Sequence, residues 1–312
     1  MNNEFNKNHA LRLFAYFLFF LIAFLISFRD AMLISDGPSY IVHAFLYDVD
    51  FTLPQVYGYP LYWLFVDIFG EYFGYFFPNF LSLVIFLFLF LIIRRISTAN
   101  IFLFLFFLML NPLIFNSMFV ALKNGLALAV LMYGLVSSKK LFTFGSIAIH
   151  PGVAPLSLLS IIFNKRVSVY IKIFLGLLGL FLMLYSDTVN DVMMSRGYDG
   201  FVAGQEMWSV YFVYLLFGVF YYLAFKSNPY RYFFIVLVLF WLILGRYYPF
   251  AWRFFSQAMV VALLILLIKS DRSQGKFLFL ISFTALSIYS TLEWHPLIEY
   301  SQGWLGYWLT FI

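Results

Sequence analysis

Long apolar runs recur along this chain, and they constrain its fold more than any other feature. A transmembrane helix needs about 20 apolar residues, because the hydrocarbon core is about 30 Å thick and a helix rises about 1.5 Å per residue. The chain is 64% hydrophobic and only 11% charged, whereas a soluble domain is about 25% charged. Strands of a membrane barrel would alternate apolar and polar residues. The sequence therefore predicts an all-α, polytopic transmembrane bundle, with residues 1–312 forming a single membrane domain.

The apolar runs also place the expected membrane segments, about 10–11 in number. Spans are predicted at 11–28, 72–93, 101–115, 118–137, 167–185, 208–226, 230–245, 250–268 and 277–292. Two short segments, 141–149 and 152–163, are interrupted at His150-Pro151 and are expected to form a broken hairpin that returns to the face it left. The stretch 59–70 is expected to lie in the interface, and 297–312 either spans or lies there.

The basic residues predict the orientation of these spans, because loops on the cytoplasmic side are enriched in Lys and Arg. With the N-terminus inside, fourteen of the nineteen basic residues fall on the cytoplasmic side and twelve of the fourteen carboxylates fall outside. Two long loops, about 29–60 and 186–207, then lie on the outer face. We therefore expect the functional face to be the outer one.

Five basic residues break this rule on the same face. Each is consistent with a side chain that reaches for the headgroups or pairs with an outer carboxylate. Five together, on separate segments, predict an outward-facing basic cavity for an anionic ligand, and the planar guanidinium suits phosphate oxygens. The five are Arg29, Lys123, Arg196, Arg246 and Arg253.

His150 stands at the break of the predicted hairpin. Proline and glycine after it free backbone groups, which is tolerated at membrane depth only where they line a cavity or are buried in protein. An imidazole has an ordinary pKa of about 6.5, which suits a proton acceptor. His150 is therefore either a catalytic base facing the outer cavity or a buried structural histidine.

A metal site is not expected. Asp48-Val49-Asp50 matches an Asp-x-Asp pattern, but two carboxylates are a weak signal, because a hard cation takes about six oxygens. The other histidines, His9, His43 and His295, have no ligand spacing around them and are interpreted as ordinary.

The order of these features resembles the Wzy-type polysaccharide repeat-unit polymerases, particularly their EpsG-like branch, over about residues 10–270. EpsG-like proteins more often have Arg-Gln where this chain has Lys123-Asn124, a change that keeps the charge but loses the bidentate geometry of arginine. The resemblance rests on Arg29, Ser35-Asp36-Gly37-Pro38-Ser39-Tyr40, Tyr57-Gly58-Tyr59, Lys123-Asn124-Gly125-Leu126-Ala127-Leu128-Ala129, His150 and the late arginines.

The resemblance implies a GT-C-like fold in the bacterial inner (cytoplasmic) membrane, with an active site facing the periplasm or outside. Such an enzyme moves a growing glycan from its polyprenyl (undecaprenyl) diphosphate onto the terminal sugar hydroxyl of an incoming lipid-linked repeat unit. The product is O-antigen (a part of lipopolysaccharide), capsule or exopolysaccharide. No metal, cofactor, nucleotide sugar or nucleic acid is implied, whereas a chain-length regulator and a flippase are expected partners beside the bilayer.

The chemistry of that reaction suggests roles for particular residues. His150 and Asp36 are the expected catalytic residues, with His150 as the proton acceptor. Sugar binding is expected of Tyr40, Tyr59 and Tyr248. The diphosphate is expected to lie against Arg29, Lys123, Arg196, Arg246 and Arg253.

Two other functions fit the same sequence. The first is a GT-C-like transferase that uses a polyprenyl-phosphate monosaccharide donor, with Asp30, Asp36, Asp48 or Asp50 as base or metal ligand. The second is a transporter or flippase of an anionic glycolipid. The second is less favoured, because ion-coupled transport usually needs carboxylates within the membrane and few occur within these spans.

Overall fold

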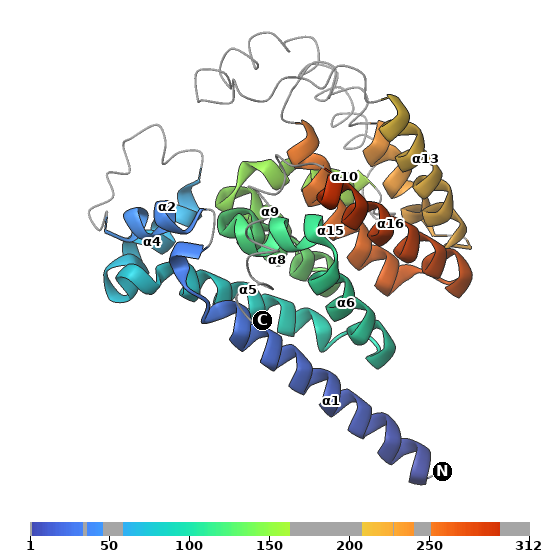
Figure 1. The fold of residues 1–312 in the computed structure, drawn as a ribbon, viewed down its shortest axis with the longest axis horizontal. Coiled ribbons are helices and arrows are strands. Elements are labelled where there is room, and N and C mark those ends of the chain that lie inside the picture. The colour runs from blue at the N-terminus through green and yellow to red at the C-terminus, as the bar shows by residue number, and fades with distance from the viewer. Residues whose placement is uncertain are drawn as a thin grey trace. The chain divides into compact units, whose positions relative to one another are not determined.

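The computed structural model describes residues 2–33, 36–45, 59–162, 208–226, 228–239 and 251–293. Every regular element in these ranges is a helix, which confirms the all-α prediction (Figure 1). Two helical stretches among them, Asn8–Ser27 and Pro60–Ile93, are long and apolar enough to cross a membrane, and several apolar helices are shorter. The predicted spans 167–185 and 297–312 lie outside the described residues.

The chain separates into two compact units. The first contains residues 1–154 and 284–312, and the second contains residues 155–283. The second unit includes α13 (Trp208–Leu223), α15 (Ala251–Lys269) and most of α10 (Ala154–Ile162) and α16 (Ser273–Glu293). Whether both units belong to one membrane domain stays a prediction.

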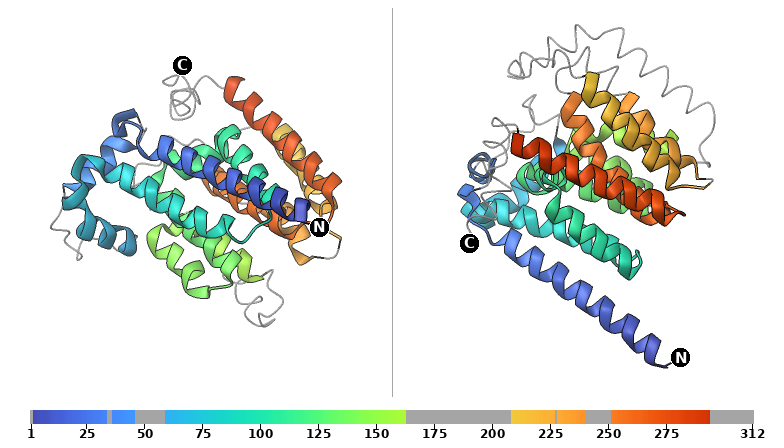
Figure 2. Two further views of the ribbon diagram at one scale, coloured as in Figure 1. Left: turned by 90° about the horizontal axis from the view of Figure 1, so that it is seen from below. Right: turned by 45° about the vertical axis from the view of Figure 1, so that its right-hand side comes forward.

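The first unit is built from helices that run alternately up and down. α1 contacts α5 and α6, α5 contacts α8, and α8 packs along α9 (Figures 1 and 2). Short turns join α5 to α6 and α8 to α9, whereas longer segments join α1 to α5 and α6 to α8. The five helices are α1 (Asn2–Ser27), α5 (Phe77–Ile93), α6 (Thr98–Leu110), α8 (Leu122–Ser137) and α9 (Lys140–Ile149).

Large apolar side chains remain exposed along α1. Leu13, Phe17 and Phe24 are each more than half exposed, while Ala15, Phe19 and Ala23 on the opposite side are buried. Large contiguous apolar surface is rare on monomeric soluble proteins. This exposure, together with the length of α1, is consistent with contact with lipid.

The apolar stretch 60–93 is divided into two helices. α4 (Pro60–Phe73) ends at Gly74, whose φ of +45° is readily adopted by glycine, and α5 begins at Phe77 after one turn of 3₁₀ helix. The rings of Phe73 and Phe80 stack across the bend with centroids 4.0 Å apart. The sequence predicts a segment at 59–70 and a separate span at 72–93; the structure also has two helices here, but the break lies at 74–76, so the span begins later than predicted. The interfacial position of α4 stays a prediction.

The predicted span 101–115 differs from the structure at its end. α6 stops at Leu110, because Pro112 disfavours a helical Asn111. Asn111 then accepts the Ile114 N–H through its side chain and starts α7 (Pro112–Phe115), which continues as a π-helical turn over Asn116–Val120. The chain therefore reaches α8 through a short helical segment, which widens to a π-helical turn, instead of a loop at 116–117.

Around His150 the structure has the predicted helix, break and helix, whereas the return of this segment to the face it left stays a prediction. α9 ends at Ile149, His150 has an extended backbone with φ −152°, and a 3₁₀ turn over Pro151–Val153 leads into α10. Proline explains the position of the break, since it disfavours a helical conformation for the residue before it.

The two ends of the first unit carry different side chains. At one end Arg12 donates to the backbone carbonyl of Arg94 at 2.9 Å, and the turn between α8 and α9 carries Lys139 and Lys140. At the other end lie Asp30 and Asp36, the start of α8 and the end of α9. Basic residues thus gather at the first end and carboxylates at the second, where Arg29 and Lys123 also lie, and the orientation of the two ends in a membrane stays a prediction.

This segregation predicts which end faces the cell exterior. The chain contains no cysteine, so single cysteines can be introduced without background. We expect Ser39→Cys, in the exposed part of α2 (Gly37–Ala44), to react with a membrane-impermeant maleimide in intact cells, and Lys140→Cys to react only after permeabilisation. The reverse pattern would overturn the orientation.

Candidate functional site

Lys123 is the centre of a cluster at the end of the first unit that carries Asp36. It lies in the first turn of α8, and its Nζ is 3.9 Å from the ring centroid of Tyr59 and 5.0 Å from that of Tyr62. Both tyrosines come from the start of α4. A cation within about 6 Å of an aromatic face is attracted by the ring quadrupole, so the two rings hold the ammonium group while removing water from it.

Tyr40 of α2 supports the start of α8. Its hydroxyl accepts the backbone N–H of Lys123 at 3.1 Å, and the residue is 5% exposed. The first N–H groups of a helix have no partner within the helix, so this hydroxyl acts as a cap. Burial, and then the charge of Asp36, raise the pKa of Tyr40. This position favours a supporting role for Tyr40 over stacking on a sugar.

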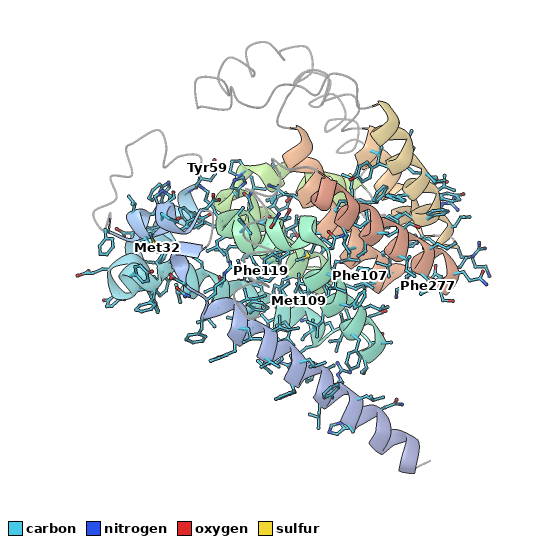
Figure 3. The ribbon with its side chains drawn as sticks, viewed as in Figure 1. Met32, Tyr59, Phe107, Met109, Phe119 and Phe277 are labelled. Carbon is cyan, nitrogen blue, oxygen red and sulfur yellow. The ribbon has the colours of Figure 1, made fainter. Side chains whose placement is uncertain are left out.

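His150 also lies beside Tyr59. The two ring centroids are 5.2 Å apart, and Figure 3 shows Tyr59 beside the end of α9. The Nδ1 atom of His150 accepts the backbone N–H of Gly152 at 3.0 Å. Because Nδ1 is used as an acceptor, the neutral ring carries its proton on Nε2.

His43 is a member of the cluster that the sequence did not identify. Its Nδ1 lies 2.9 Å from the hydroxyl of Tyr62, and its ring centroid is 4.9 Å from that of Trp63. Burial, and then the charge of Lys123, lower the pKa of His43 to about 4. The available sequence signal was the spacing of Tyr40 and His43, because residues three apart share one face of a helix.

Asp36 supplies the negative charge beside the cluster. It is exposed at the N-terminus of α2, where its side chain does not cap the helix. Its charge acts on Lys123 and on the Tyr40 hydroxyl. The Lys123 cluster, as named below, consists of Asp36, Tyr40, His43, Tyr59, Tyr62, Trp63, Lys123 and His150.

Of the remaining predicted cations, the structure describes the side chain of Arg29. The guanidinium group of Arg29 donates to the backbone carbonyl of Phe119 and lies 6.0 Å from the ring centroid of Phe115. Arg29 therefore binds the turn that leads into α8. Arg253 belongs to α15 in the second unit, and its convergence with Lys123 stays a prediction. Arg196, Arg246 and Tyr248 lie outside the described residues.

Metal ligands are not gathered in the parts of the chain that the structure describes, where no three His, Asp or Glu side chains form a group that could hold an ion. Asp48 and Asp50 lie outside those parts. The expected independence from metal therefore stays a prediction.

Comparison with protein-family models, with curated proteins and with solved structures finds no match for this chain. The resemblance to the polysaccharide polymerases accordingly rests on the residues of the chain alone.

Proposed function

We propose that this protein is a membrane glycosyltransferase that polymerises polyprenyl-diphosphate-linked oligosaccharide repeat units on the outer face of the bacterial inner membrane. The observation that carries the proposal is the meeting of Asp36, Lys123 and His150. These three residues lie in separate parts of the sequence, and contacts through Tyr40 and Tyr59 bring them to one end of the first unit.

Lys123 matches the charge that develops in such a reaction. As the bond between the sugar and the diphosphate breaks, negative charge grows on the leaving oxygen, and a cation already in place stabilises the transition state. The ammonium group of Lys123 is held by Tyr59 and Tyr62 before any substrate arrives. It therefore needs little reorganisation when the charge appears.

The proton and the bonds can be assigned to groups in the cluster. The hydroxyl oxygen of the incoming repeat unit forms a bond to the anomeric carbon of the growing chain, while the bond from that carbon to the diphosphate oxygen breaks. Asp36 accepts the hydroxyl proton as a general base, and the diphosphate leaves as an anion. The exposure of Asp36 leaves its carboxylate accessible to a large sugar acceptor.

A lipid-linked substrate also fits the surroundings of the site. The helices that carry the Lys123 cluster belong to a unit with an exposed apolar helix, α1, along its length. A polyprenyl tail can remain in the bilayer while its diphosphate reaches the polar end of the unit. This arrangement favours a lipid-linked donor over a soluble sugar nucleotide.

The direct test supplies the purified protein with one synthetic polyprenyl-diphosphate-linked repeat unit. We expect a ladder of products from the wild-type protein. The Asp36→Asn variant is expected to lower the rate of polymerisation about 10²-fold or more, because a general base contributes about 10²–10⁴-fold. Asp67→Asn, which changes an exposed carboxylate on α4, serves as the matched control and is expected to retain activity.

The same assay separates the proposal from its alternatives. Addition of a single sugar from a polyprenyl-phosphate monosaccharide, without a ladder, would point to the other class of transferase. Transfer of intact lipid across the vesicle membrane without new glycosidic bonds would point to a flippase.

A further inference from the structure

The helical path into α8 is interrupted at one backbone pair. In a continuous α-helix the N–H group of Lys123 would donate to the carbonyl of Phe119, four residues earlier. Ala121 lies between them with a φ of −86° and a ψ of 74°, which is not a helical conformation, and it separates the π-helical turn from α8. The two members of this pair are bound by other groups instead.

Two side chains from distant parts of the sequence bind the separated groups. The Tyr40 hydroxyl of α2 accepts the Lys123 N–H at 3.1 Å. The guanidinium group of Arg29, just after α1, donates to the Phe119 carbonyl. Buried backbone groups are almost always paired, because an unpaired one is unfavourable, and both Tyr40 and Phe119 are buried. One backbone bond is thus replaced by two bonds to side chains.

Arg29 approaches this break from a backbone that is itself anchored. The side-chain amide of Asn79, in the first turn of α5, donates to the carbonyl oxygens of Ser27 and Arg29 at 2.6 and 2.7 Å. Asn79 is buried, so water has little access to these bonds. The guanidinium carbon of Arg29 also lies 6.0 Å from the ring centroid of Phe115. Arg29 is therefore tied to α1, to α5 and to the segment before α8.

Tyr40 connects the break to Asp36. Its backbone N–H donates to the carbonyl of Asp36 at 3.1 Å, while its hydroxyl binds the N–H of Lys123. The Tyr40 ring packs against the rings of His43 and Tyr62, with centroids 6.0 and 6.3 Å away, and the residue is buried. One buried residue therefore bonds to the backbones of both the proposed base and the proposed cation.

We propose that Arg29 and Tyr40 are positioning residues, which together replace the broken backbone bond and fix the start of α8. Lys123 is thereby held at a constant place relative to Asp36. For the reaction that these two groups serve, the inference rests on the proposed function. A misplacement of about 1 Å can lower the rate of an enzyme about 10²-fold. Arg29 and Tyr40 thus support the reaction through the protein, whereas the sequence predicted direct contact with the diphosphate and with a sugar.

The first test measures hydrogen exchange by mass spectrometry in the substrate-free, full-length protein in detergent. Tyr40→Phe keeps the ring and removes the acceptor, whereas Arg29→Met keeps an extended apolar side chain and removes the donor. Each variant is expected to exchange about 5- to 10-fold faster at residues 121–126, as for the loss of one hydrogen bond, and at the wild-type rate at residues 129–137. Because both side chains hold the same break, the acceleration in the double variant is expected to be smaller than the product of the two single accelerations.

Tyr221→Phe is the matched control. Tyr221 is also a buried tyrosine, and its hydroxyl donates to the carbonyl of Ala262 at 3.3 Å in the second unit. This variant is expected to leave exchange at residues 121–126 unchanged, and thermal midpoints confirm that each variant is folded. Wild-type exchange at 121–126 in either folded single variant, an equal acceleration along the whole of α8, or a double variant that accelerates by the full product would overturn the inference.

The polymerisation assay supplies a second readout, which separates positioning from direct contact with the substrate. Phenylalanine stacks on a sugar as tyrosine does, so a stacking role predicts wild-type kcat and KM for Tyr40→Phe. A positioning role predicts that kcat falls about 10-fold while KM stays within about 3-fold of wild type, because the misplaced groups act in the chemical step. A Tyr40→Phe protein with the wild-type kcat, or with a raised KM alone, would overturn the role in the reaction. If the wild-type protein forms no ladder, the proposed function fails, whereas the exchange measurements still decide whether the two side chains hold the break.

Discussion

Gly125→Ala is expected to prevent normal folding, although it adds a single methyl group. A Cβ atom at this position would overlap the carbonyl oxygen of Met118 and lie 2.7 Å from its carbonyl carbon. Both atoms belong to the backbone of the π-helical turn, so no side-chain rotation can relieve the clash. Overpacking typically costs about 1–3 kcal/mol and occasionally more, and here the turn itself must move. We expect a loss of about 3 kcal/mol or more.

Gly145→Ala is the matched control, because a Cβ atom there meets nothing within 4 Å. Alanine is favoured over glycine within a helix by about 1 kcal/mol, so this variant is expected to be as stable as wild type or more so. Thermal midpoints and size-exclusion profiles in detergent compare the two. Equal midpoints would show that α8 and the turn are not packed as closely as described.

Lys123→Met is expected to lower the rate of polymerisation by about 10²–10³-fold, the typical loss for one preorganised group that stabilises transition-state charge. Methionine has nearly the length of lysine and is apolar, so the rings of Tyr59 and Tyr62 keep a neighbour while the charge is removed. The reason for the loss is therefore electrostatic. Pyrophosphate affinity is expected to fall in the same variant.

The control removes a lysine of the same unit at its opposite end. Lys140→Met changes an exposed residue at the start of α9 and is expected to leave the ladder unchanged. Steady-state rates with one lipid-linked repeat unit compare the two variants. A Lys123→Met protein with the activity of wild type would remove Lys123 from the site and weaken the proposed function with it.

The sequence determined where the chain forms helices and where it breaks. Apolar runs predicted most of the described helices, and the Pro151 signal located the break after α9 correctly. The sequence predicted the end of α6 too late. The apolar run continues past Pro112, but the helix stops at Leu110. The predicted distribution of charge across a membrane depends only on the order of spans and loops, and it stays a prediction.

Only the tertiary structure decided which polar side chains meet and what each can do. Lys123 and His150 were candidates from their positions, but their contact with Tyr59 requires α4 to lie against α9. Arg29 was a candidate for the same site, and its bond to the carbonyl of Phe119 is a contact that the sequence does not indicate. His43 was interpreted as ordinary because nothing adjacent to it in the sequence identifies Tyr62 as its partner.

The sequence predicts the helices better than the site because the two depend on interactions of different range along the chain. Helix formation and its interruption depend on residues within a few positions of one another, so they can be read along the chain. The tautomer of an imidazole and the desolvation of an ammonium group depend on partners supplied by other helices. Those partners are set by packing among α2, α4, α8 and α9, which no local pattern in the sequence specifies.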